Sequence, residues 1–82
     1  MNKEKILKNI CYTELVYERI RKKLKIDLPN KAIEEMIAQT IEETPIVCFE
    51  SIGKNYYISN IQRGIKITIN SNTTRVITVD KI

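Results

Sequence analysis

The residues best suited to chemistry form one short segment, Gly53-Lys54-Asn55-Tyr56-Tyr57. A cation beside two aromatic rings can hold a phosphate while a ring stacks on a nucleobase. Adjacent tyrosines on a strand point to opposite faces, so one of Tyr56 and Tyr57 belongs to the open face of a sheet and the other to the core. The sequence alone does not assign them. The same segment is also typical of a hairpin turn followed by β-favouring aromatic residues, which needs no ligand.

A second polar segment, residues 70–75, ends in an arginine. Asn, Ser and Thr at residues 70–74 satisfy local backbone groups and are typical of a turn without further function. Arg75 then opens the last predicted strand. We expect it on the face used by Ile77 and Val79, where a guanidinium must lie at a rim or in a pocket. The same positive surface would be extended by Arg63, Lys66 and Asn72.

A third group of cations lies near the end of the first predicted helical unit, at Arg19, Arg21, Lys22, Lys23 and Lys25. Basic residues in the last turn of a helix complement its dipole, which explains them without a ligand. The alternative is contact with an anion or a nucleic acid, for which Arg21 and Lys22 are the candidates. The chain as a whole has a net charge of +4, which is basic but not extreme.

Composition excludes several kinds of chemistry. The chain has no histidine, so His-based catalysis, His metal ligands and a His pH switch are absent. It also lacks a glycine-rich phosphate loop, a nucleophile elbow and a Cys-x-x-Cys motif. Two cysteines, Cys11 and Cys48, are too few to close a zinc site. We therefore expect neither a metal nor a cofactor, and any proton transfer must use Glu, Asp, Lys, Arg or Tyr.

We expect neither an export signal nor a membrane-spanning segment in this sequence. Its start reaches charged residues before an apolar run of signal-peptide length can form. The longest apolar stretch, Ile46 to Phe49, is far too short to span a membrane. We interpret Cys11 and Cys48 as reduced packing residues of a cytoplasmic protein that makes no membrane contact.

Two helical units in the first half of the chain must position these groups. Over residues 1–28 one stripe at helical spacing contains Ile6, Ile10, Tyr17, Ile20 and Leu24. Leu15 lies off this stripe, so we expect the helix to restart near Thr13, a residue suited to cap it. A second helix is expected to have Asn30 as its cap and to end at Thr44-Pro45. Its buried face would consist of Ile33, Met36, Ile37, Thr40 and Ile41.

From residue 46 onward, apolar residues tend to recur at every second position instead of at helical spacing. This predicts strands over residues 46–52, 56–59, 65–70 and 75–80. The connections between them are short, and short connections favour antiparallel neighbours. The predicted fold is therefore α+β, a single domain over residues 1–82 with two N-terminal helices packed on a C-terminal antiparallel β-meander of about four strands.

Three motifs together resemble a family of short bacterial proteins known as domain of unknown function 3781. The motifs are Thr13-Glu14-Leu15 with Glu18-Arg19-Ile20, then Gly53-Lys54-Asn55-Tyr56-Tyr57, and finally Ile67-Thr68-Ile69-Asn70 leading to Thr74-Arg75-Val76-Ile77-Thr78. The resemblance extends over nearly the whole chain, and the middle motif is the most specific. It implies no activity, because the family has none that could be transferred.

The order of two helices and a closing meander is similar, more weakly, to small toxin ribonucleases of the RelE/ParE and barnase-like group. That likeness implies an RNA-binding open sheet face and cleavage without histidine. Lys54 and Arg75 would then neutralise the phosphate. Tyr57 or Tyr56 would stack on a base or donate a proton, and Glu50 would be the general base. The likeness is one of fold, and one fold hosts many functions.

The sequence leaves three functions open. The first is a nucleic-acid-binding module directed at RNA, in its catalytic form a toxin-like endoribonuclease. The second is a small non-catalytic interaction protein, either an inhibitor or regulator that docks on a larger protein or a homodimer. The third is a binder of a small anionic nucleotide held by Lys54 and Arg75. The first predicts cations that converge on one surface, whereas the second predicts an exposed apolar patch or an open strand edge.

Overall fold

The helices give way to strands near residue 46, where the spacing of the apolar residues changes from helical to alternating. The computed structural model describes residues 1–82. Its helices are α1 (Lys3–Asn9), α2 (Glu14–Leu24) and α3 (Asn30–Glu43). A 3-10 turn, η1 (Ile46–Cys48), leads into the strands β1 (Phe49–Ile52), β2 (Asn55–Asn60), β3 (Ile65–Asn70) and β4 (Val76–Lys81). The predicted α+β fold is confirmed, with the first helical unit divided into two helices.

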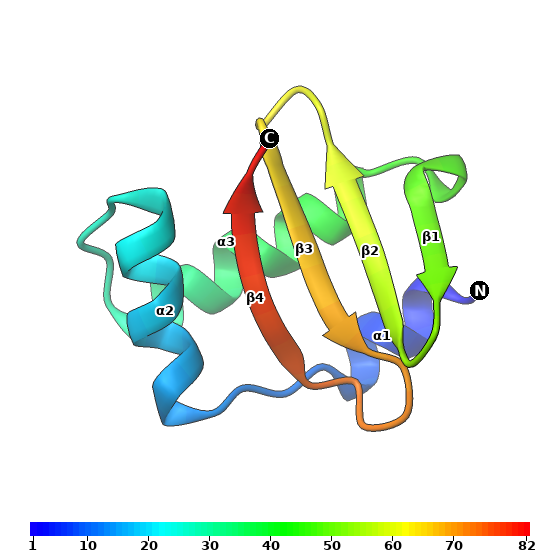
Figure 1. Cartoon of the computed structure of the whole chain (residues 1–82), viewed down its shortest axis with the longest axis horizontal. Helices are drawn as coiled ribbons and strands as arrows, with labels where there is room; N and C mark the ends of the chain where they lie inside the picture. Colours follow the sequence, from blue (N-terminus) through cyan, green and yellow to red (C-terminus); the bar gives the residue numbers. More distant parts are fainter.

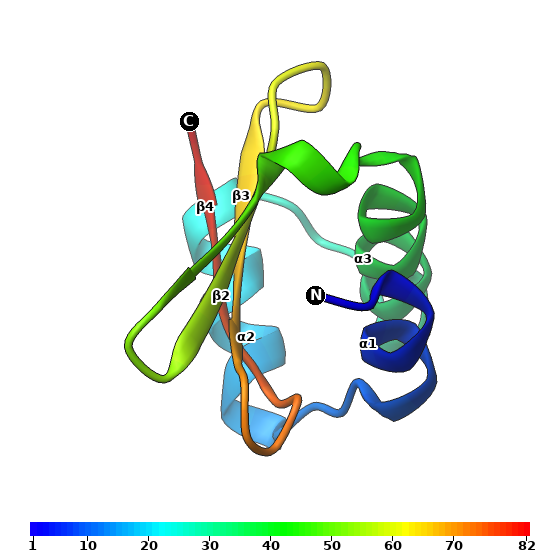
Figure 2. The ribbon, with the colours of Figure 1, turned by 90° about the vertical axis from the view of Figure 1, so that its right-hand side faces the viewer.

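The helices are distributed unequally around the sheet. α1 and α3 lie together over one face, α2 lies beside β4, and no helix covers the other face (Figures 1 and 2). One core of 15 buried apolar residues, mostly isoleucine and valine, fills the space between the sheet and the helices. Such β-branched side chains pack well on a pleated surface. None of the helices combines the length and the apolar character that crossing a membrane requires.

The first helical unit is interrupted at Cys11, whose backbone pairs with the chain at the start of the last strand. The Cys11 backbone N–H donates to the Thr74 oxygen (3.1 Å), and the Cys11 oxygen accepts from the Val76 N–H (3.0 Å). These bonds form an isolated parallel bridge between Cys11 and Arg75. α2 then starts after Thr13, as expected, although the Thr13 side chain makes no capping hydrogen bond. The N-terminal segment therefore closes the outer edge of β4 at its beginning.

The start of α3 corrects one expectation. Asn30 is the first residue of the helix and not its cap, because Pro29 holds the cap position with φ −67°. Proline fixes φ near this value and so suits an extended cap residue. The Asn30 side-chain oxygen instead accepts a hydrogen bond from Arg21, which is distant in sequence. The predicted apolar face of α3 is confirmed, since all its members are buried except Met36, which is partly buried against the core.

The four strands form an antiparallel meander in the order β1-β2-β3-β4. One row of directly opposed residues on the core face consists of Phe49, Ile58, Ile67 and Val79. Tyr56 shares this face and packs against the core, so Tyr57 is the tyrosine on the open face. The first strand is shorter than predicted because residues 46–48 form η1.

A bulge in the last ladder corrects the expected orientation of Arg75. Ile69 lies opposite Val76 while Thr68 lies opposite Thr78, so Ile77 is an extra residue on β4. An extra residue inverts the alternation of faces beyond it, which is why Val76 and Val79 are both buried. Arg75 therefore does not share a strand face with Val79. It precedes β4 at the sheet edge, where its backbone is paired with Cys11.

The packing of α2 can be tested with two substitutions on the same helix. Ile20 is fully buried, so Ile20→Ala should lower the free energy of unfolding by about 2–5 kcal/mol through lost burial and a residual cavity. Leu15 is 79% exposed, so Leu15→Ala should change it by no more than about 0.5 kcal/mol. Urea unfolding followed by circular dichroism measures both. Equal effects of the two substitutions would contradict the placement of α2.

Candidate functional site

Three of the predicted site residues, Lys54, Asn72 and Arg75, lie at one end of the sheet. Gly53 has φ +60°, and Lys54 follows it in a two-residue turn of the type that hairpins favour. The Ser71 N–H (2.7 Å) and hydroxyl (2.9 Å) both donate to the Lys54 carbonyl oxygen. The loop that contains Asn72 therefore packs beside the turn that carries Lys54. Arg75 lies at the same end of the sheet, because its carbonyl oxygen accepts from the Asn70 N–H (2.9 Å).

A second group of predicted residues meets on the open face. Glu50 and Tyr57 are directly opposed on β1 and β2. The Tyr57 hydroxyl accepts a hydrogen bond from the Asn55 amide (3.3 Å), and the Lys66 ammonium lies 5.8 Å from the centre of the Tyr57 ring. Lys66 is itself opposite Asp80 on β4. The open face thus carries both signs of charge, which does not make a cationic surface.

Arg63 lies at the opposite end of the sheet from Lys54, in the β2–β3 loop (Figure 1). Its guanidinium donates two hydrogen bonds of 3.0 Å to the Glu43 carboxylate. This contact lowers the pKa of the Glu43 carboxyl and raises the pKa of the Arg63 guanidinium, and in both cases partial desolvation opposes the shift. Arg63 therefore fastens the β2–β3 loop to α3 and does not join the cations at the other end.

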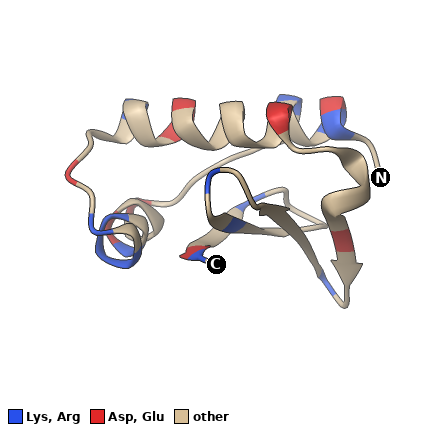
Figure 3. Ribbon diagram, turned by 90° about the horizontal axis from the view of Figure 1, so that it is seen from above, with Lys and Arg blue, Asp and Glu red and all other residues tan.

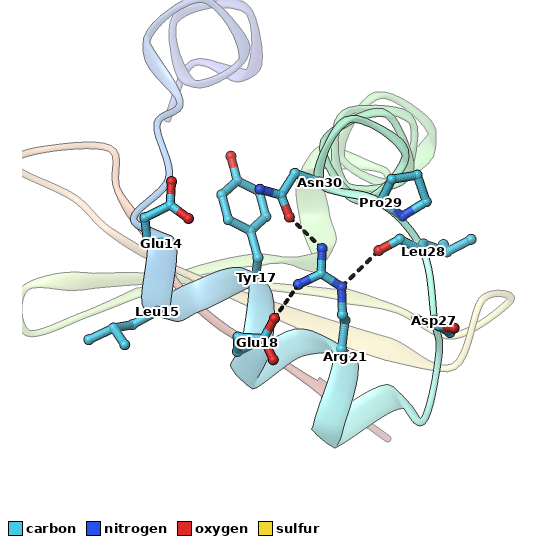
Figure 4. Close-up of a pocket in the computed structure, with 9 residues that line it drawn as sticks. All are labelled: Glu14, Leu15, Tyr17, Glu18, Arg21, Asp27, Leu28, Pro29 and Asn30. Atoms are coloured by element: carbon cyan, nitrogen blue, oxygen red, sulfur yellow. Dashed lines mark hydrogen bonds and ion pairs between the residues drawn. The ribbon is translucent and has the colours of Figure 1, made fainter.

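Arg21, predicted as an anion contact, holds the α2–α3 connection in place. Its guanidinium donates to the Leu28 oxygen (2.8 Å), to the Glu18 carboxylate (2.7 Å) and to the Asn30 side chain (Figure 4). Three partners leave little of the guanidinium for a ligand. Its neighbour Lys22 is exposed and makes no side-chain hydrogen bond or ion pair.

A hollow of about 780 Å³ lies between α2 and the α2–α3 connection (Figure 4). Carboxylates from Glu14, Glu18 and Asp27 line it, and Arg21 is its one cation. An anion would meet more negative than positive charge in this hollow. It therefore does not suit the phosphate ligands that the sequence suggested.

Tyr17 forms the most buried polar contact of this region. Its hydroxyl donates to the Glu34 carboxylate (2.5 Å), and its ring stacks on Tyr12 with centroids 5.5 Å apart. Burial, together with the hydrogen bond to Glu34, raises the pKa of Tyr17 to about 12. Burial and the charge of Glu34 also raise the pKa of the Tyr12 hydroxyl. Both phenols are therefore held protonated and structural at neutral pH.

Arg19 and Lys23, which are not among the site residues predicted from the sequence, both contact β4. The Arg19 guanidinium donates to the Ile77 carbonyl oxygen (3.2 Å), and the Lys23 ammonium contacts Asp80 (2.7 Å). Arg19 and Lys23 are four residues apart, which places both on one side of α2. This spacing is the sequence feature from which their shared position could have been predicted. In Figure 3 the basic positions gather on α2, seen end-on, whereas α3 carries several acidic positions. No cluster of three or more metal-ligating side chains is present, and both cysteines are free.

Comparison with known proteins identifies one family. The family model described as "Protein of unknown function (DUF3781)" matches residues 4–80. Neither the search of curated proteins nor the search of solved structures finds a match. The weaker likeness to RelE/ParE and barnase-like ribonucleases thus has no support from a solved structure.

The contact between Tyr17 and Glu34 predicts a loss of stability in alkali. An unfolded tyrosine ionises near pH 10, whereas folded Tyr17 does so near 12. The stabilisation is complete below pH 10 and is lost as the pH rises from about 10 to 12. Tyr17→Phe should flatten this part of the profile and cost roughly 1.5–3 kcal/mol at pH 7.

Urea unfolding of the wild type and of Tyr17→Phe at several pH values measures the difference. Tyr57→Phe is the matched control, because Tyr57 lies on the open face away from Glu34. A wild-type profile as flat between pH 10 and 12 as that of Tyr17→Phe would contradict the assignment.

Proposed function

This chain belongs to the DUF3781 family of proteins of unknown function, and we propose that it is a non-catalytic interaction domain that binds an extended segment of another protein along β1. The observation that carries the proposal is the difference between the two sheet edges. β4 is covered by α2 and by the Cys11 segment, whereas β1 has no neighbour beyond β2 (Figure 1). An uncovered edge offers a ready template for a further strand.

The backbone of β1 is oriented for such pairing. Ile52 and Asn55 flank a two-residue turn and so form a hydrogen-bonded pair. Pairs alternate along an antiparallel ladder, so the N–H and C=O groups of Ser51 point away from β2. A bound strand would hydrogen-bond to these groups without disturbing the β1–β2 hairpin.

Apolar side chains at both ends of β1 would add affinity. Val47 is 86% exposed, and Ile46 precedes it in η1. Met1 lies beside Ile46, because both line one shallow hollow with Leu7. Ile52 at the other end of the strand is also exposed. Half of the eight exposed large apolar residues, namely Met1, Ile46, Val47 and Ile52, thus lie along this edge.

The charge on β1 favours a different protein over a second copy. Glu50 is exposed on the open face and makes no ion pair. Pairing of two β1 edges about a two-fold axis would place Glu50 opposite Glu50 or opposite Ile52, and neither residue neutralises it. We therefore assign as partner an extended apolar segment with a basic residue opposite Glu50. The proposal places the protein in the cytoplasm, where Cys11 and Cys48 stay reduced.

The alternative of a nuclease centre is less well supported by the distances. Glu50 and Tyr57 are neighbours, but Glu50 lies on β1 and Arg75 at the start of β4. At the usual strand spacing their backbones are about 14 Å apart, and the Arg75 side chain lines a hollow with α2, on the far side of β4 from Glu50. Lys54, at the tip of the hairpin, does not bridge this gap because it extends beyond the ends of the strands.

Selection from a phage-displayed library of random peptides tests the proposal. Ser51→Pro removes an outward N–H without removing a β1–β2 hydrogen bond, and proline is tolerated in that orientation on edge strands. Selected peptides should bind Ser51→Pro at least about tenfold more weakly than wild type, because main-chain hydrogen bonds hold a bound strand. Ser51→Ala, which keeps the N–H, should bind like wild type.

Circular dichroism first establishes that both variants are folded. Peptides that bind Ser51→Pro as tightly as wild type would contradict docking on β1. A dimer seen by light scattering, dissociated by Ser51→Pro, would show that a second copy occupies the edge and would refute the partner assigned here.

A further inference from the structure

A small hollow at the junction of α2 and β4 differs in charge from every other hollow described above. Its volume is about 180 Å³, the liquid volume of about six water molecules. Arg19 from α2 and Arg75, which directly precedes β4, both line it together with Thr13. No carboxylate is among the lining residues. Two guanidinium groups without a counter-charge favour an anion.

Both arginines keep donors free for a ligand. Arg19 uses one terminal nitrogen for the Ile77 oxygen, which fixes its direction toward β4. Arg75 makes no side-chain hydrogen bond and no ion pair, while its backbone is held by Cys11 on one side and Asn70 on the other. The contact with Ile77 fixes the direction of the Arg19 guanidinium, whereas Arg75 is fixed at its backbone and its side chain is free to turn toward a ligand. A donor that is already held in place loses little entropy on binding.

The acidic residues of α2 do not neutralise this hollow. Glu14 and Glu18 line the groove on the α3 side of the helix, and Glu18 is paired there with Arg21 (Figure 4). Asp80, the acid on the neighbouring part of β4, is paired with Lys23. The field at Arg19 and Arg75 thus stays positive.

We propose that Arg19 and Arg75 together bind the phosphate group of a ligand in this hollow. A guanidinium presents two parallel N–H donors that match the spacing of phosphate oxygens, so two arginines can hold one phosphate from two sides. The Thr13 hydroxyl, which makes no capping bond, is available as a further donor. Leu15, 79% exposed at the rim, offers an apolar contact to the rest of the ligand.

The phosphate can come from a nucleotide monoester or from the backbone of single-stranded RNA, and both share this chemistry. The hollow is open to solvent at the α2–β4 side of the sheet, whereas the edge proposed for protein binding is at β1 (Figure 1). The two sites are therefore independent, and either can fail without the other.

Titrations of the full chain with inorganic phosphate, adenosine monophosphate and a short oligouridylate test the proposal, with arginine side-chain nitrogen resonances followed by NMR. We expect saturable shifts of the Arg19 and Arg75 guanidinium signals. Arg75→Ala should weaken binding at least about tenfold, the effect of losing hydrogen bonds to a charged group. Arg19→Ala should act likewise, and Arg19→Lys tests the need for a planar fork if the alanine variant unfolds.

Lys22→Ala is the matched control, because it removes one positive charge from the same helix without lining the hollow. Tighter binding of the monophosphate identifies a nucleotide as the source, and tighter binding of the oligouridylate identifies RNA. Equal losses for Arg75→Ala and Lys22→Ala would reduce the effect to diffuse charge attraction and overturn the proposal. So would the absence of saturation at millimolar ligand.

Discussion

The outer edge of β4 is closed by residues from the first third of the chain, and the difference between the two sides of the molecule follows from it. The Cys11 backbone pairs at the start of the strand, and the Arg19 guanidinium reaches the Ile77 carbonyl oxygen. The ion pair between Lys23 and Asp80 is exposed and contributes little by itself. Burial of Ile20 and its neighbours on α2 supplies most of the free energy that holds this helix against the sheet, because these side chains leave water completely or almost completely.

Closing one edge leaves the other as the only place where the sheet can grow. β1 is uncovered and has exposed apolar residues at both ends, and natural proteins cover or charge such an edge unless it has a partner. The closed side has a different property, because the loop before β4 and the helix beside it bring two arginines together. The two proposed sites, one for a strand of another protein and one for a phosphate, thus lie on opposite sides of one small sheet.

The elements with one strong periodicity were predictable from the sequence. The apolar face of α3 and the strand at residues 65–70 were correct because each depends on a single buried surface. The predicted orientation of Arg75 was wrong because of the bulge in β4. A bulge depends on how two strands pair, and the alternation of residues within one strand gives no information about it. The structural roles of Arg21 and Arg63 are not visible in the sequence, because their partners become neighbours only in the folded chain. These partners are Leu28 and Asn30 for Arg21, and Glu43 for Arg63.

The bridge between Cys11 and Arg75 also has a consequence for biosynthesis. A ribosome releases the N-terminus first, so α2 is made long before β4, against which it packs. Until the last strand emerges, the apolar stripe of α2 has no sheet to cover it, and contacts that close so long a loop form slowly. The fold can therefore be completed only after β4 has been synthesised, because α2 and the Cys11 segment pack against that strand.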